Sequence, residues 1–126
     1  MAETHDERRR RLRYQLIQLH VQMAKVLAGL LEPIAIPAIK RKGLFTQQVL
    51  DDLEFAYVAV NAQELDEQIQ LHLGEMIMDW RAAADYLNDE KRRASTINLD
   101  FASLQATRVL TTVHIVREML YGSPDD

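Results

Sequence analysis

The stretch from Gln47 to Asn88 decides how many helices this chain forms, and it reads QQVLDDLEFAYVAVNAQELDEQIQLHLGEMIMDWRAAADYLN. Apolar residues recur at helical spacing in its first third, and this first stripe consists of Val49, Leu53, Ala56, Tyr57 and Val60. A second stripe in the later part consists of Leu65, Ile69, His72, Met76, Trp80, Ala83 and Leu87. On one continuous helix the two stripes would point about 160° apart.

Two interpretations of this stretch remain open. No glycine or proline interrupts the chain from Thr46 to Leu73, which favours one continuous helix over 47–88. Alternatively the helix breaks near Asn61, which would act as N-cap with Glu64 completing a capping box. We favour the continuous helix, although it would be about 63 Å long and would leave apolar surface exposed at one end. A second copy of the chain would then have to cover that surface.

Helical patterns also flank this stretch. Leucines and other apolar residues alternate four and three apart over about 7–32, and Pro33 ends this helix. Thr46 is a good N-cap for the next helix. The last helix is predicted over about 101–121 and is followed by Gly122, a favoured C-terminal residue. The residues expected in the core are Leu16, Leu19, Met23, Ile69, Met76, Trp80, Val109 and Val116.

Length and composition agree with a single helical domain over 1–126, with polar termini at 1–6 and 122–126. The chain has 126 residues, of which 48% are hydrophobic, and its 4 glycines and 3 prolines are too few for a turn-rich β fold. The sequence therefore predicts an all-α bundle of three long helices, about 7–32, 47–88 and 101–121, or of four if the second breaks near Asn61.

Other classes are disfavoured by what the sequence lacks. Without cysteine there is no disulfide framework, thiolate metal site or cysteine nucleophile. The acidic start and the shortness of the apolar runs predict a cytoplasmic protein with no signal peptide and no membrane span. Glycine-rich phosphate loops and nucleophile elbows are absent, so we predict that the protein is not an enzyme and carries no cofactor.

Charge is distributed unevenly along the chain, whose net charge is −4. Between Gly43 and Trp80 there are eight acidic residues and no lysine or arginine. Five of these acids form a candidate acidic surface for a protein partner, namely Asp51, Asp52, Glu54, Glu64 and Glu67. Arginines gather near the N-terminus, where Arg8, Arg9, Arg10, Arg11 and Arg13 are candidate contacts to a partner or to phosphates.

Three histidines, His20, His72 and His114, lie in the middle of three different predicted helices. Helical bundles build metal sites from histidines and carboxylates that point inward from facing helices. The position of His114 on the polar side of its helix argues against convergence, so we predict no metal site.

The sequence thus favours a non-enzymatic protein–protein interaction module, an adaptor, regulator or inhibitor, acting as a helical homodimer. The predicted dimer interface is the first stripe of the 47–88 stretch, represented by Val49, Leu53, Tyr57 and Val60. Expected partners are a second copy of the chain and another protein. A first alternative is a dimeric regulator that binds nucleic acid through Arg8–Arg13. Another is a helical bundle that binds a metal or small ligand around His72.

Overall fold

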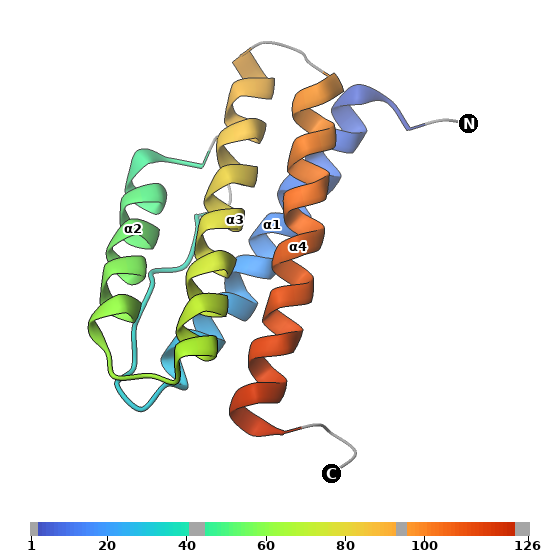
Figure 1. The fold of residues 1–126 in the computed structure, drawn as a ribbon. Coiled ribbons are helices and arrows are strands. Elements are labelled where there is room, and N and C mark those ends of the chain that lie inside the picture. The colour runs from blue at the N-terminus through green and yellow to red at the C-terminus, as the bar shows by residue number, and fades with distance from the viewer. Residues whose placement is uncertain (1–2, 41–44, 93–95, 123–126) are drawn as a thin grey trace.

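The computed structural model describes residues 3–40, 45–92 and 96–122, and every regular element in these ranges is a helix. The four helices of this described part are α1 (His5–Ala28), α2 (Gln47–Ala62), α3 (Glu67–Arg92) and α4 (Thr96–Tyr121). Helices α1, α2 and α4 run in one direction and α3 runs in the opposite direction (Figure 1). None of these helices is both long enough and apolar enough to cross a membrane.

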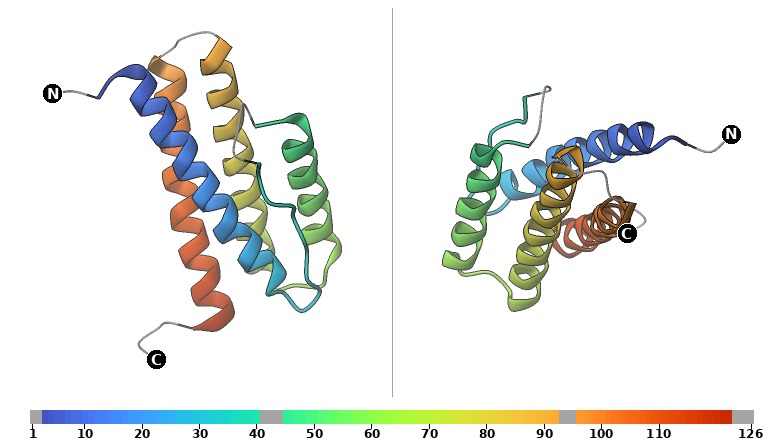
Figure 2. Two further views of the ribbon diagram at one scale, coloured as in Figure 1. Left: turned by 180° about the vertical axis from the view of Figure 1, so that it is seen from behind. Right: turned by 90° about the horizontal axis from the view of Figure 1, so that it is seen from above.

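Helix α3 is the centre of the bundle. It packs against α1, α2 and α4. Among the described helices, α2 packs only against α3. Helix α1 crosses α3 and α4 on the side that faces the viewer in the left view of Figure 2, and the extended segment after it returns between α1 and α2. Three helices therefore surround the main core, and α2 with the extended segment closes its remaining side.

The prediction of one continuous helix over 47–88 is wrong, because α2 ends at Ala62 and α3 begins at Glu67. Asp66 is the residue that starts α3. Its Oδ1 accepts hydrogen bonds from the backbone N–H groups of Gln68 (3.0 Å) and Ile69 (3.4 Å), as an N-cap does. The reversal at 63–66 turns both apolar stripes toward one core, so a single chain covers both.

The alternative of a break near Asn61 gives the right number of described helices but misplaces the boundary. Asn61 lies in the last turn of α2, where its Nδ2 donates to the carbonyl of Tyr57 (3.0 Å). The Gln70 side chain reaches back from α3 and donates to the carbonyls of Val60 (3.0 Å) and Gln63 (3.2 Å). The same two carbonyls also accept from the backbone N–H groups of Gln63 (3.3 Å) and Leu65 (3.1 Å), so the Gln70 bonds reinforce an end of α2 where regular helical bonding stops.

The other helix ends also follow local chemistry. Thr46 caps α2 as predicted, because its hydroxyl accepts from the N–H of Val49 (3.4 Å). Helix α1 ends at Ala28 rather than near residue 32, and Gly29 follows as its C-cap. Helix α3 continues to Arg92, beyond its predicted end at residue 88, and helix α4 begins at Thr96, five residues before its predicted start. Gly122 follows α4 with φ +81°, which suits glycine.

Trp80 lies at the middle of the core and is fully buried. Its Nε1 donates to the carbonyl of Leu16 (2.7 Å), and its ring lies 5.3 Å from that of His20 and 5.2 Å from that of Phe45. The predicted core is confirmed except that Ile69 is only partly buried; the buried members are Leu16, Leu19, Met23, Met76, Trp80, Val109 and Val116.

Candidate interaction surface

The residues predicted to face a second chain lie inside this one. Leu53 and Val60 are 0% exposed, and Val49 and Tyr57 are partly buried against the same core. The break before α3 explains this arrangement, because it folds the inner side of α2 onto α3. The structure therefore places these four residues against the core of their own chain and not on an exposed face.

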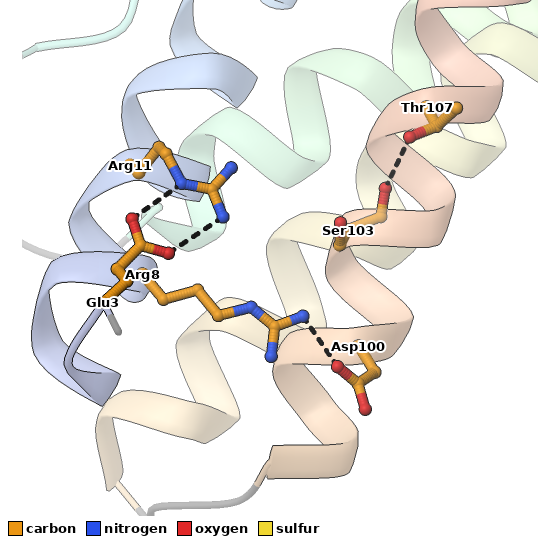
Figure 3. Close-up of polar contacts among 6 residues, drawn as sticks. All are labelled: Glu3, Arg8, Arg11, Asp100, Ser103 and Thr107. Carbon is orange, nitrogen blue, oxygen red and sulfur yellow. Dashed lines mark hydrogen bonds and ion pairs between the residues drawn. The ribbon is translucent and has the colours of Figure 1, made fainter. Parts of the chain in front are cut away.

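Three arginines near the start of α1 form ion pairs within the chain. Arg11 donates from Nε (2.9 Å) and Nη2 (3.0 Å) to the two carboxylate oxygens of Glu3, and this bond lowers the pKa of Glu3 (Figure 3). Arg8 reaches across to α4 and donates from Nη2 to Asp100 Oδ1 (2.6 Å). Arg9 lies 3.0 Å from Asp6. These pairs are partly or fully solvent-exposed, so each stabilises the fold only weakly.

Arg13 takes a different position, with its guanidinium 5.4 Å from the centre of the Phe45 ring. Its Nε and Nη2 atoms are buried and find no hydrogen-bond acceptor within the described ranges. Arg10 is exposed. The predicted cluster is thus split between ion pairs, an aromatic contact and solvent, instead of presenting five parallel guanidiniums to a phosphate backbone.

The predicted acidic surface lies on α2, the connection that follows it, and the start of α3. Four of its carboxylates are exposed and Asp52 is partly buried; the exposed ones are Asp51, Glu54, Glu64 and Glu67. Asp51 and Asp52 accept hydrogen bonds from the amides of Gln47 and Gln48, each at 2.8 Å. Since an amide carries no charge, these contacts do not neutralise the negative charges of Asp51 and Asp52.

The three histidines lie in three different environments. His20 is buried beside Trp80, and this burial lowers its pKa to about 4 against a smaller opposing effect of Asp52. His72 is partly buried and its Nδ1 lies 3.7 Å from Glu75, while His114 is exposed. Among the residues that the structure describes, no three histidine or carboxylate side chains gather as a metal site would require.

Helix α4 is apolar on two sides. The sequence-based predictions did not include the apolar residues of its outer side. Its inner side packs in the core through Leu99, Ala102, Ala106, Val109, Val113 and Val116. Its outer face exposes between 37% and 61% of five large apolar side chains, those of Ile97, Phe101, Leu104, Ile115 and Met119. The first three are spaced four and three apart, a pattern that Arg108 and Thr111 then interrupt. Because of this interruption, the outer face does not form a continuous apolar stripe in the sequence, whereas the inner side does.

Contacts with α3 hold this outer face of α4 in place. The Phe101 ring stacks on Tyr86 with centroids 5.1 Å apart and an interplanar angle of 18°. About two turns further along α4, Arg108 Nε lies 3.5 Å from Asp79 Oδ2. Burial raises the pKa of Asp79, and the charge of Arg108 opposes that effect. An aromatic pair and an ion pair therefore join α3 and α4 beside the exposed apolar residues.

Comparison of the chain with protein-family models, with curated proteins and with solved structures finds no match. Its function has to be argued from its own residues.

Proposed function

We propose that this protein is a non-enzymatic protein–protein interaction module, an adaptor, regulator or inhibitor, that acts as a homodimer through the outer face of α4. The observation that carries the proposal is the exposure of that face, where Ile97 is 61% and Leu104 57% accessible to solvent. Large apolar side chains gathered on one exposed surface are typical of protein contacts.

The spacing of the outer face supports a second copy as the occupant. A two-fold symmetric interface brings the same surface together twice. Ile97 and Met119 are each eleven residues from Arg108, and Phe101 and Ile115 are each seven residues from it. Two antiparallel copies of α4 that cross at Arg108 therefore pair Ile97 with Met119 and Phe101 with Ile115. One helix thus supplies both halves of an apolar interface.

Arg108 would lie on the axis of that dimer, where two like charges meet. Each guanidinium has a carboxylate of its own chain beside it, because Asp79 Oδ2 lies 3.5 Å from Arg108 Nε. The attraction within such a pair grows as water is removed from around it. The two Arg108–Asp79 pairs would thus offset most of the repulsion across the axis.

Light scattering tests the proposal by measuring the mass of the particle in solution. We expect about twice the chain mass of 14.5 kDa, and the monomer mass when Leu104→Glu places a charge in the apolar interface. Val21→Glu is the matched control, because Val21 is 43% exposed on α1, away from the proposed contact. Circular dichroism establishes that both variants remain helical. A natural chain that stays monomeric at about 100 μM would refute the homodimer.

A further inference from the structure

We infer that a second surface, the groove between α2 and α3, binds a cationic amphipathic helix of a partner protein. Tyr57 and Asn61 line this groove from α2, and Leu71, Gly74 and Met78 line it from α3. Glu67 and Glu75 complete its α3 wall. These residues enclose about 290 Å³ of open space. The inference adds to the proposed dimer and does not depend on it, because none of these residues belongs to the outer face of α4.

The floor of the groove is closed, and the side-chain amide N–H groups of Asn61 and Gln70 are already bonded to backbone carbonyls. At Gly74 an added Cβ would come within 3.2 Å of Tyr57 Cε2, so the missing side chain lets the tyrosine ring lie against α3. The amide of Asn61 donates to the Tyr57 carbonyl, and the amide of Gln70 donates to the carbonyls that end α2. Recognition must therefore come from the walls, which favours an extended apolar partner over a small polar ligand.

The apolar wall has a spacing that matches a helix. Leu71 is 52% and Met78 55% exposed, and the two residues are seven positions apart on α3. Seven residues of helix rise about 10.5 Å, so a partner helix lying along α3 can place two apolar residues, also seven apart, against them. Methionine adapts its side chain to differently shaped partners, which suits a docking wall.

The charge of the surrounding surface determines the sign of the charge that a partner should carry. Glu67 and Glu75 lie beside the apolar wall, and no lysine or arginine occurs between Gly43 and Trp80. Arg81 comes next, and its Nη2 lies 3.9 Å from Glu54, a separation that gives only weak compensation. Nucleic acids and anionic membranes would be repelled by these carboxylates, whereas lysines or arginines flanking the partner's apolar residues would pair with Glu67 and Glu75.

Fluorescence anisotropy with the full chain tests the inference. The probe is a labelled synthetic peptide of about 18 residues, long enough to form a helix, with leucines seven residues apart and flanking lysines. We expect saturable binding that is at least about tenfold weaker for a scrambled peptide of the same composition and for a peptide with glutamates in place of the lysines.

Variants of the chain locate the binding site. Met78→Lys, which removes an apolar contact and adds a like charge, is expected to weaken binding at least about tenfold. Glu75→Lys replaces a carboxylate whose side chain is 47% exposed. It should weaken binding of the lysine peptide and strengthen binding of a peptide with glutamate at the facing position. Val21→Lys on α1, at a side chain 43% exposed, is the matched control because it adds a positive charge outside the groove, and it should leave the peptide affinity unchanged.

These outcomes separate the groove from the dimer. Loss of the dimer in Leu104→Glu with peptide binding retained supports two independent surfaces. Equal affinity for the patterned and scrambled peptides would overturn the inference, because general charge attraction then explains the binding. Unchanged affinity in both Met78→Lys and Glu75→Lys would also overturn it, because the peptide would then bind elsewhere.

Discussion

Trp80 and Asp79 are adjacent on α3 but lie on different sides of the bundle. Trp80 is fully buried, and its only polar atom donates to the carbonyl of Leu16 at 2.7 Å. Asp79 lies beside α4, where its Oδ2 is buried with no hydrogen-bond donor in the described part of the chain and Arg108 Nε is 3.5 Å away. The inner side thus combines dense packing with a satisfied polar group, whereas the α3–α4 side leaves a charged group partly unsatisfied. Stability should depend mainly on the first side.

The largest expected effect is at the centre of the inner side. Trp80→Ala should lower the free energy of unfolding by about 3–5 kcal/mol, because it leaves a cavity among packed residues. Trp80→Phe should cost less, since it keeps most of the ring and loses the bond to Leu16. Denaturant unfolding measures both. A loss below about 1 kcal/mol for the alanine variant would show that Trp80 does not organise the core.

Helix α2 provides a similar comparison between a buried and an exposed side chain that are two residues apart. Leu53→Ala should destabilise the chain by about 2–5 kcal/mol, because Leu53 is 0% exposed. Phe55→Ala should change stability by less than about 0.5 kcal/mol, because Phe55 is 73% exposed. If the two effects were reversed, α2 would face the core with its other side.

His20 gives the inner side a pH dependence. Burial lowers its pKa from 6.5 to about 4, so between these values the unfolded chain binds more protons than the folded one. Stability should therefore fall as the pH falls from about 6.5 to about 4, by up to about 3 kcal/mol at 1.36 kcal/mol per pKa unit. His20→Leu should remove this part of the pH dependence. A wild-type slope that persists in the variant would assign it to other groups.

Asp79 should have a smaller effect on the pH dependence than His20, with the opposite sign. Its pKa is raised by burial, so above its normal value of 3.8 the folded chain binds the proton more tightly than the unfolded chain. The contribution of this group to stability rises as the pH falls from its raised pKa toward 3.8. Asp79→Asn should raise stability at neutral pH by less than about 1 kcal/mol, because losing the attraction of Arg108 offsets part of the gain. Unfolding at pH 7 and at pH 3 measures the difference.

Local signals in the sequence were sufficient for much of the fold. The helix class, the cap at Thr46 and the buried residues Leu16, Met76 and Trp80 follow from periodicity and from side-chain chemistry close in sequence. The break between α2 and α3 does not, because neither glycine nor proline marks it. Asn61 and Asp66 are both good N-cap residues, and packing onto the core decides that Asp66 is used.

The surfaces were harder to predict, because they depend on which elements meet. Arg8 and Asp100 are 92 residues apart, so no local pattern pairs them. The assignment of Leu53 and Val60 to a dimer interface followed from the continuous helix, whereas the break before α3 buries both residues within one chain. The outer face of α4 did carry a spacing signal, which a search for a second stripe on the same helix would have found.

The attachment of α2 to a single helix has a consequence for motion within the folded chain. Because α2 packs on α3 alone among the described helices, it can open without separating α1, α3 and α4. Local opening costs less than global unfolding, so the amide protons of α2 should exchange with solvent sooner than those in the middle of α3. Phe45 limits this opening, because it exchanges hydrogen bonds of 3.0 and 2.8 Å with Asn88 just before α2 begins. Helix α2 is thus held at its first turn by these bonds and at its last turn by the Gln70 bonds to the carbonyls of Val60 and Gln63, so its opening requires both sets to break.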